Sequence, residues 1–146
     1  MTIRVERLST GARERARVLF RTIAEVFAED SEDLGDSWID ALLTKDDFWA
    51  LAALEGDDVV GGLTAHTLPM TRAPGSEVFI YDIAVRTEHQ RKGVGRALVE
   101  ELRALAAARE IDDVFVAADN EDVHALDFYR ALGGEAAPVT MFTFTP

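Results

Sequence analysis

Apolar residues along the chain recur either every 3.6 residues or in short continuous and alternating runs, and these patterns predict helices and strands respectively. The helical period is clearest where apolar residues recur from Ala16 to Phe27 and again in the second half of the chain. Ser9 and Thr10 precede the first of these patterns, and their hydroxyls are expected to cap the helix that follows. The predicted helices cover residues 16–27, 38–43, 95–109 and 123–132.

Strands are predicted where apolar residues follow one another or alternate with polar ones. Residues 48–54 and 59–65 are apolar runs separated by an acidic, glycine-containing turn, which predicts an antiparallel hairpin. Residues 78–85 are almost continuously apolar, as in a central strand covered on both faces. Two prolines and a glycine make residues 69–76 a loop. Further strands are predicted over residues 3–8, 114–117 and 139–144.

The predicted order is strand, two helices, three strands, helix, strand, helix and strand. The chain has 146 residues, which is about the usual size of one domain. No internal repeat or low-complexity linker divides it. The sequence therefore predicts a single α/β domain over residues 1–146, built around one mixed sheet.

Composition excludes several kinds of chemistry. The chain has no cysteine, which excludes disulfides and a thiol nucleophile. Its three histidines, His66, His89 and His124, lack the spacing of a metal site, so no metal is expected. The first residues do not resemble a signal peptide, and no apolar run approaches the roughly 20 residues that cross a bilayer. These features predict a cytoplasmic protein.

The formal net charge is −12. A field of this sign disfavours nucleic acid and anionic membranes as partners, because phosphate binding requires clustered lysine and arginine. It favours a cationic ligand, although an acidic surface also serves solubility alone.

The turn over residues 86–95 departs from this acidic background. It leads from the predicted central strand into a helix, whose first amides are free and carry partial positive charge. Gly93 and Gly95 are expected to let these amides approach a pyrophosphate without an intervening Cβ. Three basic side chains add positive charge here: Arg91, Lys92 and Arg96. The turn matches neither the Rossmann nor the Walker A motif, and an isolated Gly-x-Gly also occurs at plain loop-to-helix joints.

Two motifs resemble the GCN5-related N-acetyltransferase (GNAT) superfamily. The segment Gln-Arg-Lys-Gly-Val-Gly at residues 90–95 fits its acetyl-CoA signature, Gln/Arg-x-x-Gly-x-Gly/Ala, at every fixed position. Residues 125–133 match the family's Ala-x-x-Phe-Tyr-x-x-x-Gly helix. The resemblance implies the GNAT fold, a mixed and mostly antiparallel sheet flanked by helices, and acetyl-CoA as co-substrate. One departure is Asp122, where many members have asparagine near the cofactor.

Within the superfamily, the chain resembles most the type I aminoglycoside 3-N-acetyltransferases. The segments that carry this likeness are residues 48–54, 59–61, 68–69 and 76–85, with Ala118-Asp119 and Asp122 further on. The resemblance implies acetylation of the 3-amino group of aminoglycoside antibiotics, and hence resistance to them. It also implies a homodimer, which is common in the family.

The resemblance assigns a role to each part of the site. Tyr129 matches the tyrosine that protonates the leaving thiolate, although a core aromatic residue would suit the same helix. The end of the central strand would bind the pantetheine arm and the turn would bind the pyrophosphate. The cofactor positions are Ile83, Ala84, Val85, Gln90, Arg91, Lys92, Gly93, Val94, Gly95 and Arg96.

Asp82 is the expected acceptor-side residue, because it is the only acid inside the central strand. A carboxylate among apolar residues is costly unless the sheet opens around it or a cation such as Arg86 neutralises it. Its expected role is to take the proton of the amine or to position the ammonium group. Glu77, Asp119 and Asp122 are further candidates for binding the acceptor, as is the acidic loop over residues 29–36.

Two other functions remain compatible with the sequence. The first is an acetyltransferase of the same fold that acts on another acceptor, such as a polyamine, a small metabolite amine or a protein amine. A non-catalytic module that binds acetyl-CoA is the second alternative, and the presence of Asp82 and Tyr129 argues against it.

Overall fold

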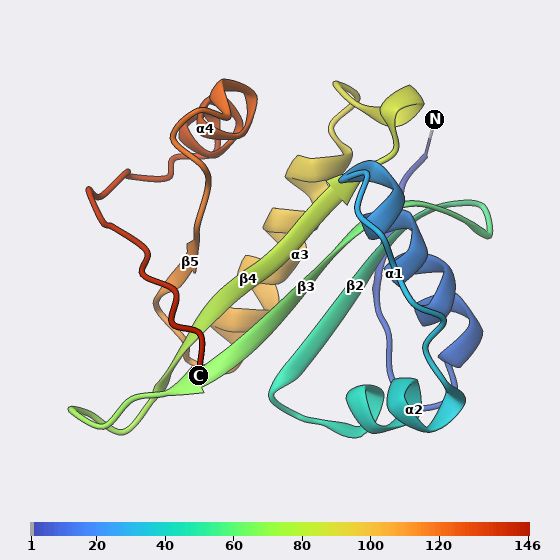
Figure 1. Cartoon of the computed structure of the whole chain (residues 1–146), viewed down its shortest axis with the longest axis horizontal. Coiled ribbons are helices and arrows are strands. Elements are labelled where there is room, and N and C mark those ends of the chain that lie inside the picture. Colours follow the sequence, from blue (N-terminus) through green and yellow to red (C-terminus); the bar gives the residue numbers. More distant parts are fainter. Residues whose placement is uncertain (1) are drawn as a thin grey trace.

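The computed structural model describes residues 2–146, which form five strands, four α-helices and one 3-10 helix (Figure 1). The strands are β1 (Arg4–Arg7), β2 (Phe48–Glu55), β3 (Asp58–Pro69), β4 (Ser76–Val85) and β5 (Val114–Val116). The helices are α1 (Arg13–Val26), α2 (Asp36–Thr44), the 3-10 helix η1 (Thr87–His89), α3 (Val94–Ala108) and α4 (Val123–Ala131).

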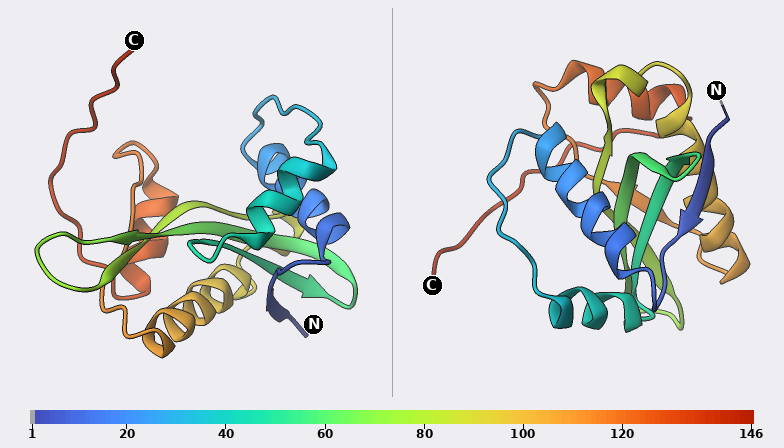
Figure 2. Two further views of the ribbon diagram at one scale, coloured as in Figure 1. Left: turned by 90° about the horizontal axis from the view of Figure 1, so that it is seen from below. Right: turned by 90° about the vertical axis from the view of Figure 1, so that its right-hand side faces the viewer.

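The strands form one sheet in the order β1-β2-β3-β4-β5. Each pair is antiparallel except β4 and β5, which run parallel. Helices α1 and α2 pack on one face and α3 on the other, as the left view of Figure 2 shows. The predicted α/β fold with a mixed, mostly antiparallel sheet is therefore confirmed.

The most buried strand is β2, whose first seven residues are all buried. Its alternate side chains pack against α1 and α2 on one face and against α3 on the other, with Trp49 and Leu51 fully inaccessible. The prediction that residues 78–85 are covered on both faces is wrong, because in β4 only Val78, Ile80 and Ala84 are buried. Each face is covered only in part, since Ala84 packs in the cluster with α1 and α2, whereas Val78 and Ile80 pack in the cluster with α3.

The expected cap of α1 does not form. Ala12 occupies the N-cap position and no side chain bonds to the first turn. The backbone closes the turn instead, because the Ala12 N–H donates to the Ser9 carbonyl at 3.0 Å. The role predicted for the Ser9 or Thr10 hydroxyl is therefore wrong.

The predicted last strand is also absent from this single chain. Residues 132–146 form no helix or strand, and Val139 and Phe144 are 80% and 89% exposed. The segment leaves the end of α4 and extends away from the sheet on the side that carries α1 and α2 (Figure 2). Its alternating pattern is that of a strand, yet no strand of the same copy pairs with it.

Candidate active site

The site begins at an irregularity in β4. Thr64 pairs with Asp82 and Ala65 pairs with Ile80, so Tyr81 is an extra residue with no partner in β3. A β-bulge of this kind bends its strand and interrupts the alternation of side chains. On the other side, β5 pairs only with Val78, Phe79 and Ile80. Beyond that point β4 and β5 separate, and the second half of β4 has a strand on one side only.

A cleft of about 770 Å³ opens where the two strands separate. Its walls come from the end of α1, the second half of β4, the turn before α3, the loop after β5 and the inner side of α4. The backbone groups of Tyr81–Val85 that would otherwise pair with β5 border this cleft. They form a ready ladder of donors and acceptors for an extended ligand.

The turn at one end of the cleft has the geometry of an anion site. Gly93 is the N-cap of α3 with φ +83°, and no side chain caps the helix. The first intrahelical bond runs from the Ala97 N–H to the Gly93 carbonyl at 3.0 Å, which leaves the amides of Val94, Gly95 and Arg96 free. Arg91 also has a left-handed φ of +61°, a strained conformation for a residue with a Cβ. Successive amides in such a turn converge on one point, where they bind anions.

The two glycines of this turn serve different purposes. A Cβ on Gly93 would meet nothing within 4 Å, so its left-handed φ is what requires glycine. A Cβ on Gly95 would lie 2.9 Å from the ring of Phe128. Gly95 therefore lets α4 pack closely on the start of α3. The missing Cβ at this position makes room for the Phe128 ring, whereas it was expected from the sequence to make room for a pyrophosphate.

Side chains hold the turn against the sheet. Gln90 donates from its amide to the Val85 carbonyl at 3.0 Å, which joins the turn to the end of β4. The Nε2 atom of His89 lies 3.5 Å from a carboxylate oxygen of Glu55, at the β2–β3 turn. Both contacts fix the position of the turn relative to the cleft.

Asp82 is half-buried beside the bulge and lines the cleft. Burial raises the pKa of its carboxyl above the ordinary value, and the negative charge of Glu29 raises it further. Both causes favour the protonated form, as expected of a carboxylate prepared to take a proton.

Arg86 does not neutralise this carboxylate. Its guanidinium donates to the Val59 carbonyl at 3.0 Å and to the Thr22 hydroxyl at 3.1 Å. A third contact lies 3.6 Å away, at a carboxylate oxygen of Glu25. No ion pair to Asp82 is formed by the residues that the structure describes, so the alternative of a neutralising arginine is wrong.

Tyr129 lies on α4, across the cleft from β4. Burial raises the pKa of its hydroxyl, and the charge of Asp122 adds to the shift. The hydroxyl therefore carries its proton at neutral pH and is a hydrogen-bond donor in the cleft. Phe128 packs beside it on Gly95, which fixes this helix relative to the turn.

Asp119 and Asp122 line the cleft, and each also shapes the loop before α4. Asp119 accepts from the Glu121 N–H at 2.9 Å, in a local turn. Asp122 caps α4 by accepting from the Ala125 N–H at 3.1 Å. In both bonds a single carboxylate oxygen accepts, which leaves the other oxygen of each group for a further partner.

Residues 14–133 match the model of the Acetyltransferase (GNAT) family. The chain belongs to this family.

Known proteins show the same relationship. GCN5-related N-acetyltransferase 2, a chloroplastic protein of Arabidopsis thaliana, is 37% identical over 87 residues, which are 58% of this chain. The match covers 33% of the plant protein, so the chain spans about a third of that curated relative.

Two similar solved structures come from uncultured soil metagenomic samples. The aminoglycoside acetyltransferase HMB0005 is 36% identical, with a TM-score of 0.95, over 100% of this chain and 99% of its own. The aminoglycoside acetyltransferase meta-AAC0020, solved with sisomicin, is 29% identical, with a TM-score of 0.95, over 99% of this chain and 96% of its own. The resemblance to GNAT aminoglycoside acetyltransferases inferred from sequence is therefore confirmed.

Most of the residues expected in this GNAT site meet at the one cleft. Asp82, Tyr129, Asp119 and Asp122 line it, as do all the expected cofactor positions except Lys92. Glu77 is not among the lining residues. It pairs with Leu68 near the opposite end of β4, roughly 16 Å from Asp82 at about 3.3 Å per residue.

Other lining residues were not predicted. Val26 and Phe27 belong to the end of α1, His124 to the start of α4, and Tyr81 to the bulge. The bulge at Tyr81 cannot be recognised from the sequence, because the residues around it form a continuous apolar run. The contribution of α1 depends on how that helix crosses the sheet.

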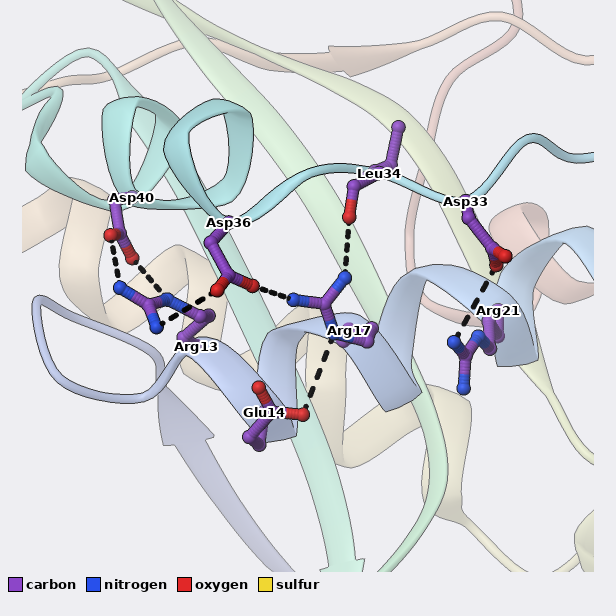
Figure 3. A network of polar contacts seen from close by, with 8 residues as sticks. All are labelled: Arg13, Glu14, Arg17, Arg21, Asp33, Leu34, Asp36 and Asp40. Atoms are coloured by element: carbon purple, nitrogen blue, oxygen red, sulfur yellow. Dashed lines mark hydrogen bonds and ion pairs between the residues drawn. The ribbon is translucent and has the colours of Figure 1, made fainter.

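Some acids of the loop after α1 form ion pairs that stabilise the fold. Arginines of α1 hold it in a network that reaches α2 (Figure 3). Arg17 binds the Leu34 carbonyl and Asp36, and Arg13 pairs with Asp36 at 3.3 Å and with Asp40. The last acids of the loop therefore hold it in place, whereas Glu29 lies near enough to Asp82 to affect its pKa.

Residues 2–146 contain neither a membrane-spanning helix nor a cluster of metal-binding side chains. No helix within them is both long and apolar enough to cross a membrane. Nor do they contain a group of three or more histidine, aspartate or glutamate side chains arranged to hold a metal ion.

Proposed function

We propose that the protein is an N-acetyltransferase that uses acetyl-CoA to acetylate an amino group of an aminoglycoside. The observation that carries this proposal is the composition of the cleft. An anion-binding turn lies at one end, an unneutralised carboxylate lies at Asp82, and both adjoin the unpaired half of β4. A long anionic donor and a cationic amine fit side by side in such a cleft.

The residues of the chain fit acetyl-CoA. The free amides at the start of α3, with Arg91, Lys92 and Arg96 nearby, suit a pyrophosphate. The unpaired backbone groups of Ile83, Ala84 and Val85 suit the amides of a pantetheine arm. When bound, acetyl-CoA supplies an acetyl group as an activated thioester.

The acetyl group then passes directly from acetyl-CoA to the amine, while two side chains move the protons. An amine with a reference pKa of about 7.7 to 10.4 is mostly protonated at neutral pH, and the Asp82 carboxylate accepts its proton. The free amine nitrogen attacks the thioester carbonyl carbon, and the carbon–sulfur bond breaks. The Tyr129 hydroxyl gives its proton to the departing sulfur, and the second proton, which the nitrogen loses as it becomes an amide, restores the Tyr129 hydroxyl. The first proton passes from Asp82 to solvent. No cysteine is present to form an acyl-enzyme.

The acceptor side favours a polycationic amine with a flat apolar surface. Asp82, Asp119 and Asp122 present negative charge. Beside them, a row of aromatic rings crosses the sheet, with Phe48 and His66 5.4 Å apart and His66 and Tyr81 5.9 Å apart. Sugar rings carrying ammonium groups match both features. We propose the 3-amino group as the site of acetylation, resistance as the outcome, a homodimer as the assembly and the cytoplasm as the location.

Turnover of acetyl-CoA against a panel of aminoglycosides and polyamines tests this proposal, with the position of the new acetyl group found by NMR. The expected product carries the acetyl group on the 3-amino nitrogen of an aminoglycoside. If only polyamines or protein amines are acetylated, the proposed acceptor is wrong and the proposed mechanism still holds. Binding of acetyl-CoA without release of CoA for any amine would make the protein a binding module.

A further inference from the structure

Arg86 follows the last residue of β4 and makes contacts that the proposed mechanism does not use. Its guanidinium donates to the Val59 carbonyl of β3 at 3.0 Å and to the Thr22 hydroxyl of α1 at 3.1 Å. Thr22 is only 1% exposed, and its own hydroxyl donates to the Val18 carbonyl at 2.8 Å. A hydrogen bond from a charged donor to a buried hydroxyl is stronger than one between neutral groups. Arg86 therefore joins the end of β4 to both β3 and α1.

The end of α1 lacks the signals that usually terminate a helix. Its last turn, residues 23–26, contains no basic side chain to oppose the partial negative charge of the helix end. Ala28, just beyond it, has a left-handed φ of +52°, a conformation that usually requires glycine. Arg86 brings a positive charge from outside the helix, because its Nη1 atom lies 3.6 Å from a carboxylate oxygen of Glu25. The last turn of α1 is therefore expected to depend on Arg86.

One face of α1 leads from the core to the cleft. Leu19, Thr22 and Val26 lie on this face, because residues three or four positions apart share one side of a helix. Leu19 packs so closely on Gly62 of β3 that a Cβ there would lie 2.2 Å from its Cδ1 atom. At the other end of the face, Val26 lines the cleft, as does Phe27. Figure 1 shows this end of α1 beside the arrowhead of β4. The contact at Thr22 therefore lies between a closely packed point of the core and a wall of the cleft.

We propose that Arg86 is a positioning residue that holds the end of α1 at the cleft and thereby sets the affinity for the acceptor. Glu29 follows this end of α1 and its charge acts on Asp82, so the helix end lies on the side proposed for the acceptor. The side proposed for the donor is held separately, since the backbone N–H of Arg86 donates to the Val60 carbonyl at 2.8 Å and does not involve the guanidinium. The effect on the acceptor rests on the proposed function, whereas the contact between Arg86 and α1 does not.

Kinetics of Arg86→Gln test the role in acceptor binding. The change removes the charge and the bond to Thr22, so the KM of the best aminoglycoside should rise about five- to tenfold, with kcat and acetyl-CoA affinity unchanged. A loss of folded protein would instead lower the apparent kcat and leave KM unchanged. The control Arg109→Gln removes an arginine that pairs with Asp46 at 3.1 Å, at the other end of α3 from the cleft, and should leave KM unchanged. An unchanged acceptor KM in Arg86→Gln, or an equal rise in the control, would overturn the proposal.

Variants of Thr22 test the same contact from the other side and decide the proposal even if Arg86→Gln does not fold. Thr22→Val keeps the shape of the side chain and removes the hydroxyl, so the acceptor KM should rise about two- to fivefold. Thr22→Ser keeps the hydroxyl and should restore the wild-type KM. Because both residues act through one contact, the double variant Arg86→Gln/Thr22→Val should have no larger effect than Arg86→Gln alone. A wild-type KM in folded Thr22→Val, or additive effects in the double variant, would contradict the proposed contact.

Hydrogen exchange followed by mass spectrometry tests the hold on α1 without any substrate. In Arg86→Gln, the amides of residues 23–29 should exchange at least about fivefold faster than in the wild type, while those of residues 13–18 keep their rates. Unchanged exchange over residues 23–29 would overturn the proposal, whichever amine is the acceptor. Faster exchange with an unchanged acceptor KM would also overturn it, because Arg86 would then hold the helix without affecting the acceptor. Faster exchange in a protein that acetylates no amine would contradict the proposed function and support the contact between Arg86 and α1.

Discussion

The sides of the cleft proposed for the donor and for the acceptor share β4, but one is made of backbone and the other of side chains. The side proposed for the donor offers backbone amides held by left-handed residues at Arg91 and Gly93. The side proposed for the acceptor offers carboxylates from β4 and from the loop before α4. A donor site made of backbone depends on conformation, whereas an acceptor site made of side chains depends on residue identity and charge. The two sides should therefore respond differently to substitution.

The largest effect is expected for Asp82→Asn. The change keeps the size of the side chain and removes the proton acceptor, and loss of a general base costs about 100- to 10,000-fold in rate. We expect this loss in kcat/KM for the best aminoglycoside, with acetyl-CoA affinity unchanged in calorimetry. Wild-type kcat/KM in a folded variant would make Asp82 a structural residue and leave Asp119 as the leading candidate.

The pH dependence of the wild type sharpens this test. Burial raises the pKa of Asp82, so its carboxylate is lost at a higher pH than for an exposed aspartate. The kcat/KM is expected to fall as pH falls through this raised pKa. The folded state binds this proton more tightly than the unfolded chain, so ionisation of Asp82 costs stability as pH rises. Asp82→Asn should consequently unfold at the same temperature as the wild type or higher at neutral pH, measured by calorimetry.

Gly93→Val addresses the donor side. A left-handed conformation costs a residue with a Cβ about 1–2 kcal/mol, and a β-branched residue more, so the turn should open. We expect acetyl-CoA affinity to fall about 10- to 100-fold in calorimetry. Gly56→Val is the matched control, since Gly56 has φ +61°, also has nothing near its Cβ, and lies in the β2–β3 turn. Unchanged CoA affinity in folded Gly93→Val, or an equal loss in the control, would contradict the donor assignment.

Smaller effects are expected from the remaining acceptor-side charges. Asp119→Asn and Asp122→Asn preserve the local hydrogen bonds, because asparagine forms the same turn and cap. Each removes one partly exposed charge, which is worth up to about 1 kcal/mol, so the KM of a polycationic acceptor should rise about two- to fivefold.

Salt supplies the control for these two variants. Exposed charges are screened over about 8 Å at physiological ionic strength, so the difference from the wild type should shrink at high salt. An acceptor KM that is the same in the wild type and both variants at low salt would show that these acids do not bind the acceptor.

Gly95→Ala tests the packing at the junction of the two sides. The added methyl group would lie 2.9 Å from the Phe128 ring, and overpacking of this kind costs about 1–3 kcal/mol. The Tm should fall by several degrees. Gly35→Ala is the control, because its methyl group would meet nothing within 4 Å. Equal Tm values for the two variants would contradict the packing role of Gly95.

The sequence allowed much of the fold to be predicted, because the periodicity of apolar residues reflects burial in one copy. Every α-helix and every strand of the sheet lies within a few residues of its expected place, whereas the 3-10 helix η1 was not predicted. The failures in β4 have a common cause, which is that strand pairing is not encoded in the pattern of the strand itself. The burial of β4 depends on how far β5 runs beside it, and the bulge at Tyr81 depends on pairing with β3. Residues 139–144 have the pattern of a strand, but no strand of the sheet pairs with them among residues 2–146.

The candidate site was predictable on one side more than on the other. The donor turn has a motif because its conformation requires glycine at Gly93. The acceptor side has no comparable spacing, since Asp82, Asp119 and Asp122 meet only through the fold. Glu77 illustrates the limit, because it lies on the same strand as Asp82 but near the far end from the cleft. Arg86 was a plausible partner for Asp82 by sequence distance, yet its contacts lie with α1 and β3.

The bulge at Tyr81 has an evolutionary consequence. Because one extra residue sets the frame of β4, an insertion or deletion there would reorient the backbone proposed to bind pantetheine together with the Asp82 side chain, and binding of both proposed substrates would be lost at once. Point substitutions in the loops around the cleft carry no such penalty, since they leave the backbone of β4 intact. Under the proposed function, a lineage of such proteins is therefore free to exchange one amine for another by single codon changes, while its dependence on the same acyl carrier is inherited with the shape of the strand.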